Sequence, residues 1–191
     1  MRKLVCFGDS ITARNEGMPQ PMLTTKLATR LQGFEIVNAG VSGDNTCDAL
    51  ARIEEDVIHH QPDFVTVLFG ANDAAFHKMI DLETYQSNLN KITDLLKSHK
   101  TVLISPSPVD ETVQFARNNE TLNQYALAVK RVAEGTGSYF IDFFNEMISL
   151  ENYQLKLKGI MNDGLHFGEE GYDFLVGLIE RKINEIEGAI K

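Results

Sequence analysis

The stretch KLVCFGDSIT, residues 3–12, joins a short apolar run to a polar turn. A continuous apolar run of this length is typical of a strand that is covered on both faces of a sheet. Four similar runs rich in Val, Ile, Leu or Phe follow along the chain, at 35–39, 64–69, 101–104 and 139–142. The pattern therefore predicts five buried strands, of which residues 3–8 form the first.

Longer amphipathic segments lie between and after these runs. Their apolar residues recur at helical spacing over 85–96, 122–133 and 172–186, and we expect these stripes to be core-facing sides of helices. Strands that alternate with helices predict an α/β fold with a parallel sheet and helices on both faces. No repeat or linker interrupts the pattern, so we expect one domain over residues 1–191.

The composition limits the partners and the location of the protein. A formal net charge of −9 argues against nucleic acid or an anionic membrane as the main partner, because the electrostatic contribution would be repulsive. The apolar run before Gly8 is too short for a signal peptide, and no window approaches the roughly 18 apolar residues of a membrane span. We therefore expect a cytoplasmic protein with no integral membrane association.

Cysteine and histidine patterns give no indication of a metal site. The two cysteines lack metal-binding spacing, and we expect Cys6 to be a buried small apolar residue, with a Cys6–Cys47 disulfide or a reactive thiol as the alternative. His59 and His60 are expected to end a helix. His77 is expected to lie in a solvated loop, although it could contact a substrate.

Four short blocks carry the polar residues of interest. They are GDSIT at 8–12, NAGVSGDNT at 38–46, GAND at 70–73 and DGLHF at 163–167. Ligands of parallel α/β sheets bind at the carboxyl ends of the strands, which is where the first three blocks are predicted to lie. Each block alone is well explained as a turn or a helix cap. Together they supply the parts of an acyl-transfer site.

The candidate nucleophile is Ser10, and its candidate general base is His166. A serine hydroxyl becomes an effective nucleophile only when a base takes its proton. Asp163, three residues before His166, could accept a hydrogen bond from His166 Nδ1–H, so that Nε2 faces Ser10. Asp9 is the other carboxylate near Ser10, and we expect it to hold the turn rather than to serve as the acid of the triad.

An acyl-transfer site also needs donors for the negative oxygen that develops in the transition state. The backbone N–H groups of Ser10 and Gly43 are two candidates, and we expect the side-chain amide of Asn72 to donate a third N–H. Asp73 is expected to brace the loop that carries Asn72.

At these blocks the sequence resembles the GDSL, or SGNH, hydrolase family. The second name stands for a Ser, a Gly, an Asn and a His, which match Ser10, Gly43, Asn72 and His166. The resemblance runs from residue 8 to residue 167. It implies a flavodoxin-like three-layer α/β/α sandwich with a five-stranded parallel sheet, a Ser–His–Asp triad with a Ser/Gly/Asn oxyanion hole, and no metal or organic cofactor. Ile-Thr in the first block and Phe167, where a proline is frequent, are small departures that affect local loop shape.

The leading functional hypothesis is a serine esterase or acylhydrolase that takes small-molecule carboxylic esters with short to medium acyl chains. A carbohydrate O-deacetylase and a thioesterase are alternatives within the family, and a non-catalytic flavodoxin-like binding module is an alternative of another class. The sequence lacks the Gly-x-x-x-x-Gly-Lys of a phosphate-binding loop and leaves the oligomeric state open. Apolar residues of the predicted rim loops are candidate acyl or alcohol contacts: Met18, Met22, Ala74, Ala75, Phe76, Met79, Pro106, Pro108, Val109, Phe115 and Phe167.

Overall fold

A computed structural model describes residues 1–190 and contains one parallel sheet, with Lys191 outside the described part. Five strands lie in the spatial order β2-β1-β3-β4-β5. The predicted strands are all present, with ends shifted by at most one residue. Their bounds are β1 Arg2–Gly8, β2 Phe34–Gly40, β3 Phe64–Leu68, β4 Thr101–Ile104 and β5 Tyr139–Ile141.

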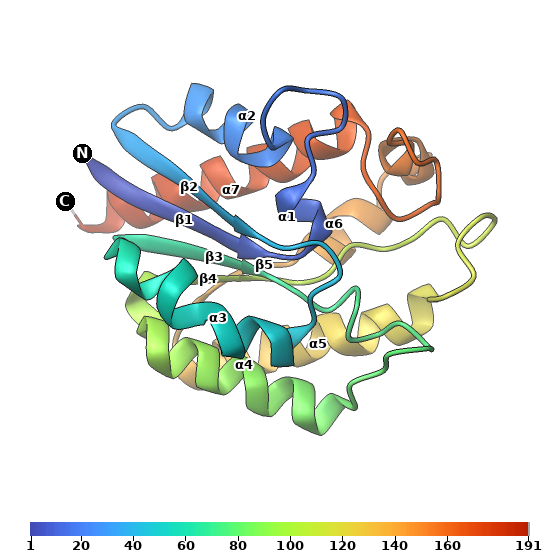
Figure 1. The fold of residues 1–191 in the computed structure, drawn as a ribbon, viewed down its shortest axis with the longest axis horizontal. Helices are drawn as coiled ribbons and strands as arrows, with labels where there is room; N and C mark the ends of the chain where they lie inside the picture. The colour runs from blue at the N-terminus through green and yellow to red at the C-terminus, as the bar shows by residue number, and fades with distance from the viewer. Residues whose placement is uncertain (191) are drawn as a thin grey trace.

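Helices cover both faces of this sheet, which confirms the predicted three-layer α/β/α sandwich (Figure 1). Helices α2 and α7 lie on one face, and α3, α4 and α5 lie on the other. The helix bounds are α1 Ser10–Ala13, α2 Met22–Arg30, α3 Thr46–Asp56, α4 Leu82–Leu96, α5 Asn119–Thr136, α6 Phe143–Ile148 and α7 Glu169–Ile190, with short 3-10 helices η1 Ile58–His60, η2 Ser98–Lys100 and η3 Tyr153–Leu157.

Alternation of side chains along the strands builds two cores. Successive residues of a strand point to opposite faces of its sheet. Val5 and Phe7 of β1 accordingly belong to the core under α3, α4 and α5, whereas Leu4 and Cys6 belong to the core under α2 and α7. Burial on both faces explains why the strand sequences are continuously apolar rather than alternating.

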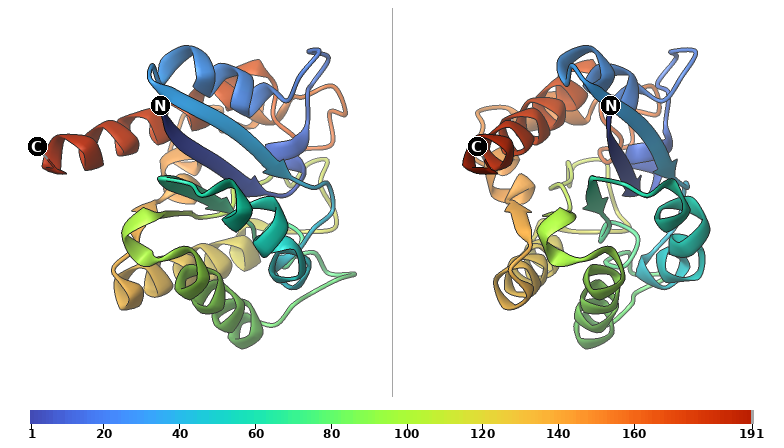
Figure 2. Two further views of the ribbon diagram at one scale, coloured as in Figure 1. Left: turned by 60° about the vertical axis from the view of Figure 1, so that its left-hand side comes forward. Right: turned by 90° about the vertical axis from the view of Figure 1, so that its left-hand side faces the viewer.

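The order of the strands positions the site. The chain passes from β1 to β2 on one side and then returns to β3 on the other side of β1. In proteins with this strand order, ligands bind where the direction of the strand order reverses, which here is beyond the carboxyl ends of β1 and β3. The turned views show the sheet between its helical layers (Figure 2). The end of α7 projects beyond the amino ends of the strands, away from the carboxyl ends.

Close packing against β2 fixes the short helix α1. A Cβ atom on Gly40 would lie 2.5 Å from the backbone nitrogen of Ala13 and 2.8 Å from the carbonyl carbon of Thr12. Only a residue without a side chain allows α1 to approach the end of β2 this closely. Because Ser10 is the first residue of α1, this contact also sets the position of Ser10.

Cys6 and the paired histidines His59 and His60 follow the sequence expectations. Cys6 is buried, Cys47 is exposed and both are free thiols, so the alternative disulfide is absent. His59 and His60 end the 3-10 helix η1, directly after α3. Within residues 1–190, no helix combines the length and the apolar character needed to cross a membrane.

Candidate active site

Ser10 lies at the start of α1, at the point where β1 ends. Asp9 caps this helix, because its Oδ1 accepts a hydrogen bond of 2.9 Å from the backbone N–H of Ile11. From the far side, the Tyr172 hydroxyl of α7 donates to the carbonyl oxygen of Ile11 at 2.9 Å. Caps and anchors of this kind hold a helix that is too short to be stable by itself.

The three predicted triad residues are in direct contact. Ser10 Oγ lies 2.9 Å from His166 Nε2, and His166 Nδ1 lies 2.7 Å from Asp163 Oδ2. The second carboxylate oxygen of Asp163 accepts the backbone N–H groups of His166 at 3.0 Å and Leu165 at 3.1 Å. One carboxylate therefore orients both the imidazole ring and the loop that carries it.

The same contacts determine the charge of Asp163. Partial burial raises the pKa of this carboxyl group, but the hydrogen bonds from His166 and Leu165 outweigh burial, so the net pKa is lowered. Asp163 is consequently ionised at neutral pH. An ionised partner at Nδ1 favours the tautomer in which Nε2 is free to accept the Ser10 proton.

Ser10 and His166 open into a cavity of about 390 Å³ at the carboxyl end of the sheet. Gly43, whose φ of +90° is unfavourable for residues with a side chain, forms part of its wall. Among residues 1–190 the N–H groups of Ser10 and Gly43 donate no hydrogen bond. The residues lining the cavity are Ser10, Arg14, Ser42, Gly43, Asn72, Gln114, Arg117, Asp163, Leu165 and His166.

Asn72 reaches the cavity as expected, but its amide is already hydrogen-bonded. Nδ2 donates to the carbonyl oxygen of Asp44 at 2.8 Å and approaches Asp9 Oδ2 at 3.3 Å. Its Oδ1 accepts a hydrogen bond of 3.0 Å from a terminal nitrogen of Arg117. The expectation of an amide N–H reserved for an oxyanion is therefore incomplete, because Asn72 also joins three segments of the chain.

Arg117 and Arg14 are cavity residues that the sequence analysis missed. Arg117 is buried, and its Nε donates to the carbonyl oxygen of Ala71, next to Asn72. It lies in the irregular segment before α5, and no sequence pattern connects it to Asn72. Arg14 could have been found, because residues four apart share one face of a helix and Arg14 follows Ser10 by four.

The carboxylates of Asp9 and Asp73, which lie next to Ser10 and Asn72 in the chain, have distinct surroundings. Complete burial raises the pKa of Asp9 to about 7; the charges of Asp73 and Asp44 add to this effect and that of Arg117 opposes it. Asp73 Oδ1 accepts the backbone N–H of Thr46 at 2.9 Å and the Thr46 hydroxyl at 2.6 Å. Asp73 thus ties the loop that carries Asn72 to the start of α3.

The apolar rim residues proposed from the sequence do not line this cavity. Ala74, Ala75, Val109 and Phe167 are fully buried, because their loops fold back onto the core. His77 is exposed and is not part of the cavity wall. Leu165 is the one apolar side chain of the wall within the described residues.

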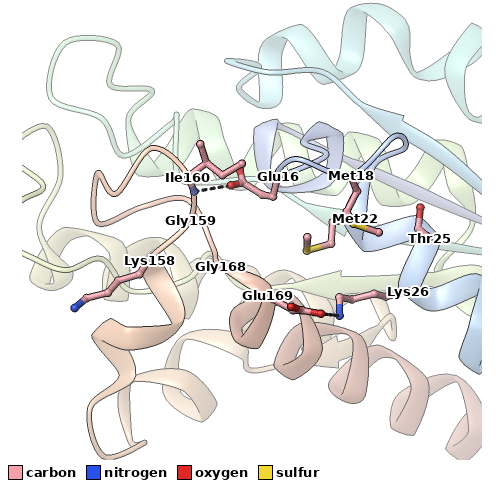
Figure 3. Close-up of a pocket in the computed structure, with 10 residues that line it drawn as sticks. All are labelled: Glu16, Met18, Met22, Thr25, Lys26, Lys158, Gly159, Ile160, Gly168 and Glu169. Carbon is pink, nitrogen blue, oxygen red and sulfur yellow. Dashed lines mark hydrogen bonds and ion pairs between the residues drawn. The ribbon is translucent and has the colours of Figure 1, made fainter.

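Met18 and Met22 instead line a separate cavity of about 320 Å³ between α2 and the segment 158–169 (Figure 3).

Comparison with known proteins places this geometry among ester hydrolases. A family model described as the GDSL-like Lipase/Acylhydrolase family matches residues 6–174. The crystal structure of the lipase/acylhydrolase from Enterococcus faecalis is 32% identical, covers 96% of this chain and 95% of its own, and superposes with a TM-score of 0.87. The human isoamyl acetate-hydrolyzing esterase 1 homolog is 32% identical over 96% of this chain and 84% of its own length.

The acetylxylan esterase of Geobacillus stearothermophilus is a third relative, 33% identical over 61% of this chain and 58% of its own. Its structure superposes with a TM-score of 0.73, at 27% identity over 95% of this chain and 94% of that one. Three solved forms of that enzyme are described as catalytic mutants, in which a serine, an aspartate and a histidine are each replaced by alanine. Its aspartate precedes its histidine by three positions, which is the spacing of Asp163 and His166.

Proposed function

The chain belongs to the GDSL-like lipase/acylhydrolase family, and we propose that it hydrolyses carboxylic esters by attack of Ser10, with His166 as general base and Asp163 as its partner. The observation that carries this proposal is the unbroken series of contacts from Ser10 Oγ through both ring nitrogens of His166 to Asp163 Oδ2. The equivalent spacing of aspartate and histidine in the acetylxylan esterase supports it.

In the proposed acylation step, His166 Nε2 takes the Ser10 proton as Oγ forms a bond to the ester carbonyl carbon. Asp163 stabilises the imidazolium that results. The ester C–O bond then breaks, His166 gives its proton to the leaving alcohol oxygen, and the acyl group remains on Ser10. In deacylation, His166 takes a proton from a water molecule that attacks the acyl-enzyme, and the acid is released as Ser10 recovers its proton.

The negative oxygen of the tetrahedral intermediate requires donors that are already in place. The N–H groups of Ser10 and Gly43, which have no acceptor among the described residues, supply two. Asn72 supplies the third. Its 3.3 Å contact to Asp9 is long for an N–H···O hydrogen bond, so this N–H is the one that the oxyanion recruits.

We propose short acyl chains as the preferred substrates. The cavity wall is polar apart from Leu165, so it offers no apolar channel for a long chain. Two relatives carry names that refer to acetyl esters, isoamyl acetate-hydrolyzing esterase and acetylxylan esterase. The second name makes a saccharide O-deacetylase the alternative. A p-nitrophenyl ester series, compared with acetylated xylo-oligosaccharides, separates these substrates by kcat/KM.

Covalent labelling tests the mechanism directly. A fluorophosphonate reacts with a serine that a base activates, and mass spectrometry of the labelled protein should place the adduct on Ser10. Ser10→Ala should lose both the label and esterase activity, and His166→Ala should lose most of each. An adduct on Ser42, which also lines the cavity, would refute the assignment.

A further inference from the structure

Arg14 is a cationic side chain in the wall of the Ser10 cavity that the proposed hydrolysis does not use. Its backbone N–H donates to the Ser10 carbonyl oxygen at 3.0 Å, and its own carbonyl oxygen accepts the N–H of Met22 at 3.0 Å. The backbone of Arg14 is thus fixed on both sides, one helical turn beyond the nucleophile.

The guanidinium group of Arg14 is held at one nitrogen only. Its Nε donates to Glu16, whose carboxylate is almost completely buried. The same carboxylate accepts the N–H of Ile160 at 2.8 Å (Figure 3). The two terminal nitrogens of Arg14 have no hydrogen-bond acceptor among residues 1–190. The other arginines near the site differ, because terminal nitrogens of Arg117 and Arg52 donate to Asn72 and to Asp56, respectively.

The anchor of Arg14 indicates which part of an ester it meets. Glu16 binds the backbone of Ile160, and the neighbouring Gly159 N–H donates to the His166 carbonyl oxygen at 3.1 Å. Arg14 is therefore attached to the loop that carries His166. In the proposed mechanism His166 delivers a proton to the departing alcohol, so the alcohol portion lies beside this loop.

We propose that Arg14 binds a carboxylate in the alcohol portion of the ester and so selects substrates that carry an anionic group on that side. This inference rests on the proposed function. A guanidinium fork with free terminal N–H groups matches a carboxylate in two parallel hydrogen bonds. The surroundings of Arg14 also suit an anion, because Arg117 is a second cation in the wall and the carboxylate of Asp163 is engaged by His166.

The test compares phenyl acetate with meta- and para-acetoxybenzoate, which add a carboxylate to the same leaving group. The measured quantity is the ratio of kcat/KM for each charged ester to that for phenyl acetate, so the effect of a variant on the ratio is independent of intrinsic ester reactivity. Because a hydrogen bond between two charged groups is lost, Arg14→Met should lower the ratio for at least one isomer about 10-fold or more. Arg30→Met is the matched control, because Arg30 pairs with Asp173 and Glu180 outside the cavity, and it should leave the ratio unchanged.

Arg14→Met also leaves the buried Glu16 without its cation, so a second variant guards against misfolding. The double variant Arg14→Met, Glu16→Gln removes both charges. The side-chain amide oxygen introduced at position 16 can still accept the Ile160 N–H. An unchanged ratio for both isomers in the folded single or double variant would overturn the inference. Phenyl acetate hydrolysis that survives Ser10→Ala would instead refute the proposed function, so the two failures are distinguishable.

Discussion

At the scale of single residues, Asn72 combines a structural and a chemical duty. Its amide bridges Arg117 on one side and the Asp44 carbonyl on the other, and it lines the cavity beside Ser10. Asn72→Ala should lower kcat about 10²–10³-fold with little change in KM, because a donor to the transition state is lost. It should also lower the melting temperature, because Arg117 and Asp44 lose a partner.

Steady-state kinetics and thermal unfolding of one purified Asn72→Ala sample separate the two duties. A variant with kcat within a few fold of the native value and a lower melting temperature would show that Asn72 only holds its loop. The kinetics are measured well below the melting temperature, so that unfolding does not contribute to the loss of rate.

The buried carboxyl group of Asp9 predicts a pH-dependent stability. Its folded pKa is raised to about 7, so between the unfolded value of about 3.9 and 7 the folded protein binds a proton that the unfolded chain has lost. Asp9 therefore stabilises the fold at low pH, and this contribution is lost as pH rises through about 7. Asp9→Asn cannot titrate, so native stability should fall relative to the variant as pH rises.

At 1.36 kcal/mol per pKa unit, this relative change is about 2–3 kcal/mol between about pH 5 and pH 8. Urea unfolding of both proteins at the two pH values measures it. The Asp9→Asn variant also loses an acceptor for Asn72, but that cost is a constant offset that cancels in the pH difference. A pH-independent difference would mean that Asp9 is ionised throughout this range.

The sequence alone predicts which site residues lie together when those residues belong to recognisable blocks. Ser10, Asp163 and His166 were placed together because each follows or precedes a predicted element and their chemistry is complementary. The contact of Arg117 with Asn72 was not predicted, because Arg117 lies 45 positions away in an irregular loop. Hydrogen bonds between irregular segments depend on the packed fold and leave no periodic pattern in the sequence.

At the scale of elements, α1 shows how packing replaces intrinsic helix stability. It has four residues, and its contact with Gly40 leaves no room for a Cβ atom. Gly40→Ala should displace α1 and with it Ser10, lowering the free energy of unfolding by about 1–3 kcal/mol and reducing kcat. Gly135→Ala is the control, because Gly135 lies within α5 and, among residues 1–190, an added Cβ would meet no atom within 4 Å beyond its chain neighbours and the backbone of its own helix.

Denaturant unfolding and ester hydrolysis of the two alanine variants provide the comparison. Gly135→Ala should be neutral or stabilising by about 0.5–1 kcal/mol, because alanine is the better helix former. Native stability and native kcat in Gly40→Ala would show that α1 can shift without cost, contrary to the packing argument.

Element lengths also explain what could be predicted along the chain. The helices α4, α5 and α7 contain 15, 18 and 22 residues, enough turns for an apolar stripe to be evident. The rim loops carry apolar residues too, and their burial could not be judged from sequence. Val109 and Phe167 were expected at the substrate but belong to the core, since irregular segments have no period that distinguishes an inner face from an outer one.

At the scale of the whole molecule, the site joins the two ends of the chain. Ser10 and His166 are 156 positions apart, and their contact requires that α7 and the preceding loop dock on the same face of the sheet as α1. Tyr172 of α7 makes this link directly, because its buried hydroxyl donates to the Ile11 carbonyl oxygen at 2.9 Å. The assembly of the site is thus coupled to the docking of the C-terminal helix.

Tyr172→Phe tests this coupling. The change removes one oxygen atom, keeps the ring that packs against Phe167, and leaves the Ile11 carbonyl oxygen buried without this donor. The free energy of unfolding should fall by about 1–3 kcal/mol, and kcat should fall as well because α1 loses its anchor. Tyr139→Phe on β5 is the control, since the Tyr139 hydroxyl makes no hydrogen bond within residues 1–190, and it should change neither quantity appreciably. Equal behaviour of the two phenylalanine variants in urea unfolding and in ester hydrolysis would show that α7 positions Ser10 through apolar packing alone.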